Sequence, residues 1–453
     1  MRAAPAPRRR GPPAPAPPPA PGRLHPTVWL FLGALVMSAP FDLGPLSMTA
    51  LRLLCLLVSL PLLAQVLAGR HGRVLASDWL AVAVLGWMTA TLVRTEGAGA
   101  VQLVGSMGVE MLGGYLIARV HVRDHHAFLA LARVLVGATA LLLPFVAFEA
   151  VRGAAPIAVA LSKLPLLEAI PRGNAEVRMG LHRAQASFLH PIHFGLYASV
   201  VFALAWTALA GQVSETRRVL GAAAVGLAGF LSLSSGGILA IAIQVALIGW
   251  TWVVPARLPR WWLLVGVAGL AYVAVDLLSN RAPLQVLMSY ATFSPHNAWW
   301  RLAIFEAGMA NVAANPLMGL GMGDWARPDW MHSASVDNYW LLLAMRHGVP
   351  GVVLTAAMWA ALALPAALRP LDPEGAAGRA RRAWTFSICG LSFTLATVHV
   401  WGDAHALVYF VLGAGAWVLR GEAPEAAPAA PAPVPRAGTR HTRFDPPSRP
   451  ARA

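Results

Sequence analysis

Residues 331–351 read MHSASVDNYWLLLAMRHGVPG, and they join a polar segment directly to an apolar, helix-forming one. Asp337 and Asn338 stand at the mouth of the helix, where Asp and Asn are favoured N-caps. A carboxylate close to a hydrocarbon layer is otherwise costly. Asp337 therefore has two open interpretations, as a helix cap or as a residue with a chemical task.

The composition around this stretch is that of a membrane protein. The chain has 453 residues, of which 57% are hydrophobic and 12% charged, whereas a soluble domain usually carries about 25% charge. The net charge is +15, but the basic residues form short clusters between apolar runs. That pattern is typical of the positive-inside rule rather than of a nucleic-acid-binding surface, so we expect no nucleic-acid partner.

The apolar runs predict an all-α fold, a polytopic transmembrane bundle of about twelve spans, each near the ~20 residues that a helix needs to cross a bilayer. The expected spans lie at about residues 27–41, 47–68, 75–93, 100–118, 127–150, 187–210, 218–234, 236–254, 261–278, 335–368, 384–401 and 403–419. Residues 27–420 form the membrane domain. The Pro/Ala-rich segments 1–26 and 421–453 are expected to be disordered tails.

Every second connection between the spans is basic, and these connections are expected on the cytoplasmic side. Their arginines are Arg70, Arg73, Arg119, Arg123, Arg217, Arg218, Arg257, Arg260, Arg369, Arg379, Arg381 and Arg382. With Arg8, Arg9, Arg10 and Arg23 before the first span, both tails are expected to be cytoplasmic. The pattern thus predicts a multi-pass membrane protein.

Two long connections face outward, at about residues 152–186 and 279–334, and they are expected to be periplasmic loops that carry short interfacial helices. Long loops on a rigid scaffold are where function concentrates. The first loop is cationic and violates the positive-inside bias. Its charged residues are Arg152, Lys163, Arg172, Arg178 and Arg183, against Glu168 and Glu176. The cluster favours either phosphate binding or anchoring to lipid headgroups.

The second loop is expected to contain a helix from His296 to Ala314, lying at the interface. Trp299 and Trp300 suit the headgroup layer. Arg301 beside them has two interpretations, a snorkelling or cation–π contact or a phosphate contact. The segment NPLMGLGMGDW that follows is glycine-rich, which favours a structural turn over a ligand-binding loop.

A general base in these loops could come from several side chains. Asp337 or His332 could accept a proton from a sugar hydroxyl. His190, His193 and His296 are further candidates. We expect no metal and no cofactor, since no ExxH or HxxxH pair falls on an outer helix face.

Together these motifs resemble the O-antigen ligase and O-antigen polymerase superfamily. The resemblance is strongest where an Arg on an interfacial helix precedes NPLMGLG, followed by VDNYW and GVPG. An earlier stretch, FLHPIHFGLY with Arg183 before it, matches a second signature.

The resemblance implies an inverting glycosyl transfer, without metal, from an undecaprenyl-pyrophosphate-linked glycan to an acceptor sugar at the outer leaflet. Arg183, Arg301 and Arg178 would bind the pyrophosphate. Asp337 or His332 would be the base. Asn338, His296 and Trp300 would position the glycan. Membrane lipid and a chain-length regulator are further expected partners.

The sequence departs from the ligase pattern in two places. Ligases typically carry His where this chain has Asp337, which favours a polymerase of O-antigen or exopolysaccharide repeat units. The family's Ser-Arg pair is replaced by Ser234–Ser235–Gly236, so that one phosphate contact is either lost or supplied by Arg178 or Arg172. A ligase is the alternative. A transporter or flippase is a further one, because Glu110 and Glu149 fall within spans.

Overall fold

The computed structural model describes residues 23–420, except for residues 45, 166, 169, 171–176, 256, 281–285 and 287–294. For residues 295–298 it describes the helix but not the side chains. Arg172 and both tails therefore lie outside the described residues.

Each of the expected spans corresponds to a helix. These are α1 (Pro26–Val36), α2 (Ala50–Leu67), α3 (Ala76–Glu96), α4 (Ala100–His121), α5 (His125–Arg152), α7 (Pro191–Ala203) with η2 (Leu204–Ala208), α8 (Glu215–Leu231), α9 (Ser235–Val253), α10 (Arg260–Leu278), α13 (Tyr339–Leu368), α14 (Ala376–Leu395), and α15 (Asp403–Gly413) with η3 (Ala416–Leu419).

Seven helical stretches in the described part of the chain are long and apolar enough to cross a membrane. One of them, Ala76–His121, contains both α3 and α4, which η1 (Gly97–Gly99) joins. Two other apolar stretches, Pro26–Val36 and Asp403–Leu419, are shorter. The chain is thus a helical membrane protein, and the number of about twelve spans stays a prediction.

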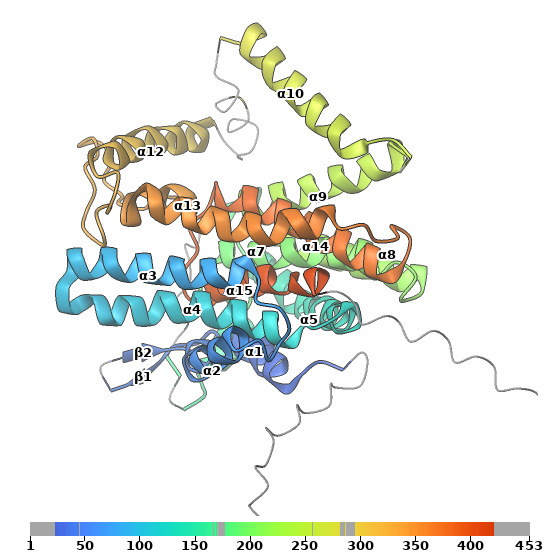
Figure 1. Cartoon of the computed structure of the whole chain (residues 1–453), viewed down its shortest axis with the longest axis horizontal. Helices are drawn as coiled ribbons and strands as arrows, with labels where there is room; N and C mark the ends of the chain where they lie inside the picture. Colours follow the sequence, from blue (N-terminus) through green and yellow to red (C-terminus); the bar gives the residue numbers. More distant parts are fainter. Residues whose placement is uncertain are drawn as a thin grey trace, which may run out of the picture. The chain divides into compact units, whose positions relative to one another are not determined.

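The helices pack closely where small residues let their backbones approach. α3 lies between α4 and α13, and α4 also packs against α2 and α15 (Figure 1). A Cβ atom added at Gly114 of α4 would lie only 2.1 Å from the carbonyl oxygen of Ala406 in α15. Such close contacts are how membrane helices gain packing energy without a hydrophobic driving force.

The fold is not purely α-helical, since it includes two small antiparallel hairpins. They are β1 (Phe41–Leu43) with β2 (Leu46–Met48), and β3 (Val177–Arg178) with β4 (Leu181–His182). The second turns through Met179 and Gly180, whose φ angles of 53° and 78° are both positive, as in the tight turns of two-residue hairpins. This hairpin and α6 (Pro156–Leu161) lie in the first long loop.

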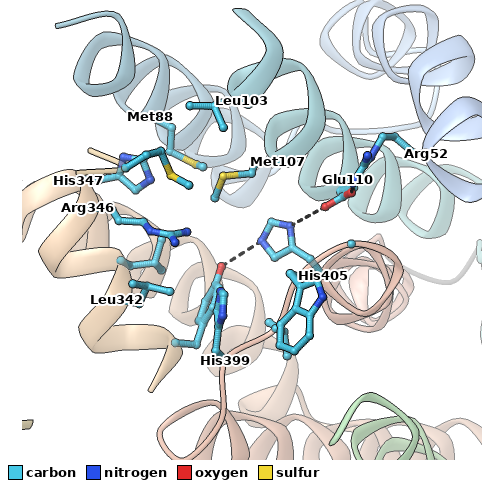
Figure 2. A pocket seen from close by; sticks show the side chains of 16 residues that line it. Arg52, Met88, Leu103, Met107, Glu110, Leu342, Arg346, His347, His399 and His405 are labelled. Carbon is cyan, nitrogen blue, oxygen red and sulfur yellow. Dashed lines mark hydrogen bonds and ion pairs between the residues drawn. The ribbon is translucent and has the colours of Figure 1, made fainter. Parts of the chain in front are cut away.

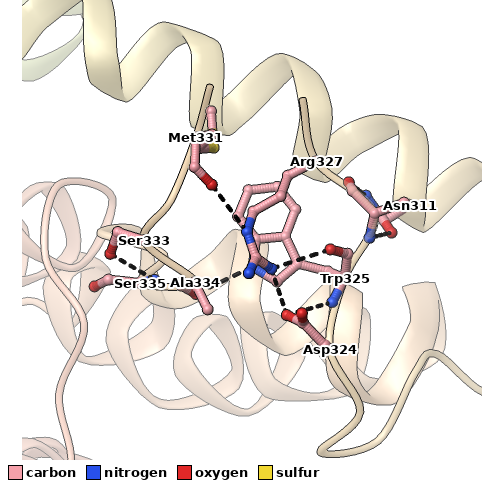
Figure 3. Close-up of polar contacts among 9 residues, drawn as sticks. Asn311, Asp324, Trp325, Arg327, Met331, Ser333, Ala334 and Ser335 are labelled. Atoms are coloured by element: carbon pink, nitrogen blue, oxygen red, sulfur yellow. Dashed lines mark hydrogen bonds and ion pairs between the residues drawn. The ribbon is translucent and has the colours of Figure 1, made fainter. Parts of the chain in front are cut away.

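The second long loop contains α12 (Pro295–Ala314), which confirms the helix expected from His296 to Ala314. α12 packs against α13. An irregular segment follows α12, and Asn311 of the helix holds it in place. The Asn311 side chain donates to the Ala326 carbonyl at 2.7 Å and accepts from the Ala326 amide at 2.9 Å. Figure 3 shows this contact, and also Trp325 donating to the Ala334 carbonyl (3.0 Å).

The glycine-rich segment is a structural turn that docks on a kink in α13. Gly348 has φ 69° and ψ 179°, which interrupts the helix, and Pro350 has no amide hydrogen to offer the Arg346 carbonyl. The amides of Leu320 and Gly321 donate instead to the carbonyls of Met345 (2.7 Å) and Arg346 (3.0 Å). The loop thus satisfies backbone groups that hydrocarbon could not.

Candidate functional site

A cavity of about 290 Å³ brings together six of the side chains singled out from the sequence. Its lining consists of Arg178, Arg183, His190, Ile192, Ser234, Ser235, Trp300, Arg301, Ser335, Asp337 and Val398. These residues come from both long loops, from α12 and from three helix N-termini, those of α7, α9 and α13. Helix N-termini favour anions, so the backbone and the arginines attract the same kind of ligand.

Arg301 lies on α12 and reaches α9. Its Nη2 donates to Ser235 Oγ at 3.2 Å, whereas its buried Nη1 has no hydrogen-bond partner among the described residues. Burial lowers the pKa of Arg301 and Arg178 lowers it further, while the Asp337 carboxylate opposes them. A buried guanidinium donor without a partner is costly, and an anion in this cavity would satisfy it.

Arg183 follows the β3–β4 hairpin and is positioned by a carboxylate beneath it. The buried Glu149 of α5 accepts hydrogen bonds from the amides of Gln185 (3.1 Å) and Ala186 (3.0 Å). Ala186 has a φ of 53°, a conformation that costs free energy in a residue with a Cβ. Glu149 therefore fixes the turn that carries Arg183 into the cavity.

Arg178, on β3, donates from Nη1 to the carbonyl oxygen of Leu233 at 3.0 Å. Leu233 directly precedes Ser234 and Ser235, where the resemblance expects an arginine that this chain lacks. A guanidinium from β3 thus reaches the start of α9, next to the position of the missing side chain.

Asp337 and Asn338 have different surroundings, and only one of them caps the helix. Asn338 is the N-cap of α13, and its Oδ1 accepts a hydrogen bond from the Leu341 amide at 3.0 Å. Asp337 lines the cavity and accepts a hydrogen bond from Ser335 Oγ at 3.3 Å. α13 begins at Tyr339, directly after Asn338, which confirms that Asp337 and Asn338 stand at the start of this helix.

His190 is the N-cap of α7, and its Nδ1 accepts a hydrogen bond from the Ile192 amide at 3.1 Å. Burial first, and then the charges of Arg183 and Arg178, lower the pKa of His190 to about 4. The ring is therefore neutral near pH 7. With Nδ1 as acceptor, its proton is on Nε2, so His190 offers the cavity a hydrogen-bond donor rather than a base.

The lining of the cavity is suited to an anion. Its charged side chains are three guanidinium groups and one carboxylate. A pyrophosphate diester carries one negative charge on each of its phosphoryl groups. Arginine binds such oxygens in pairs and remains charged at working pH.

Of the remaining expected residues, Trp300 also lines the cavity. His332 is exposed and does not belong to the lining, and the side chain of His296 lies outside the described residues. The contributions of Ser234, Ser235 and Val398 were not expected. Val398 reaches the site because its carbonyl accepts the Tyr339 amide (3.1 Å), a contact between distant segments.

A second cavity, of about 280 Å³, lies on the other side of the segment 398–402. Its apolar wall includes Met88, Leu103 and Met107 (Figure 2). Figure 2 also shows Arg346 and His405 directed toward the space between them.

The charged residues of this second cavity are largely paired with one another. Arg52 donates to Glu110 at 2.9 and 2.7 Å, and His405 Nδ1 lies 3.6 Å from the same carboxylate. Glu149 is hydrogen-bonded near the first cavity, as described above. Glu110 and Glu149, the two carboxylates that kept a transporter as an alternative, thus both have structural partners.

No curated protein matches the chain. Residues 219–356 match the family model Wzy_C, described as O-antigen ligase. The matched segment extends from α8 into α13 and includes Ser235, Arg301, Asp337 and the kink at Gly348, whereas Arg178 and Arg183 precede it. Over these residues the match confirms the resemblance to the O-antigen ligase and O-antigen polymerase superfamily.

Proposed function

We propose that the chain polymerises a polyprenyl-pyrophosphate-linked repeat unit of an O-antigen or exopolysaccharide. The reaction would take place at the outer leaflet of the bacterial inner membrane, with both termini in the cytoplasm. The observation that supports this most is the cavity in which Arg178, Arg183 and Arg301 gather around one carboxylate, Asp337. The family match supports the class of enzyme.

The donor would bind through its pyrophosphate. Arg301 offers a buried donor atom, Arg183 is fixed by the turn on Glu149, and Arg178 reaches the start of α9. As the bond between the anomeric carbon and the pyrophosphate oxygen breaks, that oxygen keeps the electron pair and its negative charge grows. Fixed cations aimed at developing charge lower the barrier, and one such donor contributes on the order of 10²–10³ in rate.

The acceptor would be the sugar hydroxyl of a second repeat unit. Its oxygen attacks the anomeric carbon from the face opposite the leaving group, and the Asp337 carboxylate takes the hydroxyl proton. The products are the lengthened glycan, with inverted configuration at that carbon, and polyprenyl pyrophosphate. Asp337 is available for this role because Asn338 alone caps α13. His332, the other candidate base, is exposed outside the lining.

A ligase that transfers a finished glycan to another acceptor is the second candidate, and the same cavity would serve it. The carboxylate at position 337 favours the polymerase, since the resemblance associates His there with ligases. A transporter or flippase loses its main support, because Glu110 and Glu149 are both engaged in structural contacts.

The test is a gene deletion followed by separation of lipid-linked and surface glycans on a gel. Loss of a polymerase leaves single repeat units on the lipid and none in polymer form. Long polymer that stays on the lipid would identify a ligase, and repeat units confined to the cytoplasmic leaflet would identify a flippase. Complementation with the unmodified chain is the control.

A further inference from the structure

A third cavity, of about 330 Å³, shares no lining residue with the two cavities described above, and it is basic. Four arginines line it, Arg218, Arg260, Arg379 and Arg382, and the one carboxylate in its lining is Glu374. They come from α8, α10, α14 and the connection before α14, at the helix ends next to the arginine-rich connections.

The positive charges of this cavity are only partly balanced. Glu374 lies 4.0 Å from Arg382, and its side chain is 79% exposed. Arg218 pairs with Glu215, which is also exposed and lies outside the lining. Exposed ion pairs contribute little, since water competes for both partners.

The start of α14 adds to the positive electrostatic potential of this cavity. The helix begins at Ala376, and its N-cap Gly375 makes no side-chain cap hydrogen bond. Arg379 and Arg382 occupy the first two turns, where the helix dipole disfavours cations. The Nε atom of Arg379 is buried without a hydrogen-bond partner in the described part of the chain. Each of these features would be stabilised by an anion.

Burial lowers the pKa of Arg382, Arg260 and Arg379 lower it further, and Glu374 opposes them. The guanidinium groups therefore crowd each other in this cavity. They are held together by the packing of their helices rather than by carboxylates.

Tryptophans place the cavity at the level of lipid headgroups. Trp206 and Trp252 belong to the lining, and Trp252 is 70% exposed. Arg218 lies over the Trp206 ring at 4.2 Å, and Arg260 over the Trp261 ring at 5.2 Å. Tryptophan is enriched at membrane–water interfaces, so that a lipid beside these rings would have its phosphate at the height of the arginines.

We propose that this cavity binds the phosphate of an anionic phospholipid from the leaflet at the arginine-rich end of the bundle. Basic pockets between membrane helices are suited to such headgroups. The ligand chemistry is a phosphate group, whose other source would be free phosphate in solution. The exposed tryptophans and the apolar side chains at the rim, among them Ile248 and Phe386, favour the lipid.

The experiment is lipid binding by native mass spectrometry on the full-length, delipidated protein in detergent. The probes are phosphatidylglycerol and phosphatidylcholine with the same acyl chains, and inorganic phosphate as a competitor. The pocket variant is Arg260→Gln with Arg382→Gln. Its matched control, Arg217→Gln with Arg257→Gln, removes two exposed arginines near the same connections.

We expect the unmodified protein and the control to prefer phosphatidylglycerol. The pocket variant should bind it at least about tenfold more weakly, as loss of charge-assisted hydrogen bonds implies. Inorganic phosphate should not displace the lipid. Equal binding of the two lipids by the unmodified protein would overturn the proposal, whether or not the variants fold. So would an equal loss in the control, or displacement by inorganic phosphate.

Discussion

Asn338 accepts the Leu341 amide at 3.0 Å and caps α13, whereas Asp337, one residue earlier, faces a cavity that it shares with Arg301. The two adjacent residues are chemically similar, but their side chains thus have different surroundings. At the N-cap the side chain turns back toward the helix amides, and the preceding side chain does not. The cap interpretation therefore belongs to Asn338, and a chemical role for Asp337 can be tested without disturbing the helix.

Asp337→Asn should lower the polymerisation rate by about 10²–10⁴, the usual contribution of a general base, with little effect on thermal stability or donor affinity. The amide preserves the shape of the side chain but does not accept a proton. The measurement is turnover of purified lipid-linked repeat units, together with thermal unfolding in detergent.

Asn338→Ala is the complementary variant, since it removes the cap and should cost about 1 kcal/mol of stability. Asn338→Asp should retain the cap, and His332→Ala should leave the rate near that of the unmodified protein. Full activity of Asp337→Asn would reject the proposed base.

Arg183→Gln and Arg301→Gln should each reduce the rate by about 10²–10³, because each removes a cation aimed at the leaving group. Arg301→Lys should recover only part of the loss, since an ammonium group does not bind phosphate oxygens in pairs. Arg152→Gln is the matched control. It removes an exposed arginine at the end of α5, outside the cavity lining. Equal activity of all four variants would contradict a phosphate site here.

Arg178 is expected to substitute for an arginine that the resemblance places at the start of α9. Arg178→Gln should weaken donor binding, and adding Ser235→Arg should restore part of it, because the second change returns a guanidinium to the same cavity. Donor affinity of the single and double variants checks this. If the double variant binds no better than Arg178→Gln, the substitution hypothesis fails.

Two glycines at the kink of α13, Gly348 in the helix and Gly319 in the loop docked on it, should not tolerate a side chain. A Cβ at Gly348 would lie 2.0 Å from the Leu317 carbonyl oxygen, and one at Gly319 would lie 2.5 Å from the Arg346 carbonyl. Both glycines also have positive φ angles. Gly348→Ala and Gly319→Ala should therefore each cost more than about 3 kcal/mol. Gly249→Ala, in open space within α9, should be neutral or slightly stabilising. Yield and unfolding temperature measure the difference.

His190 should contribute to pH dependence below neutrality. Its folded pKa of about 4 lies below the ordinary 6.5, so that between these values the unfolded chain takes up a proton that the folded chain does not. Stability is then present above pH 6.5 and is lost as the pH falls toward 4. His190→Gln should flatten the fall in unfolding temperature between pH 7 and pH 5. An unchanged slope would show that His190 titrates normally.

Much of the helical architecture is predictable from the sequence, because an apolar run of membrane length has few alternatives to a helix. The interfacial helix α12 was predicted to within one residue at its start. The β3–β4 hairpin was not, since strands of two residues have no period to detect. The sequence also left open which residue caps α13, because Asp337 and Asn338 are about equally good caps in isolation.

Of the cavity lining, the sequence singled out the four charged residues together with Trp300 and His190. Arg178, Arg183, Arg301 and Asp337 could be singled out because cations and a carboxylate on the outer side of a membrane domain need an explanation. The segment 398–402 could not, since it reaches the cavity through a single backbone contact between Tyr339 and Val398. His332 lies outside the cavity lining, because nearness in sequence to Asp337 does not determine direction in an irregular loop.

The docking of residues 316–321 on α13 also restricts how this protein can be engineered. The amides of Leu320 and Gly321 donate hydrogen bonds to two carbonyls inside the helix. An epitope tag, a linker or a transplanted loop inserted between Pro316 and Gly321 would break these hydrogen bonds and leave both carbonyl oxygens without their donors. Chimaeras between relatives should therefore exchange this segment and α13 as one block.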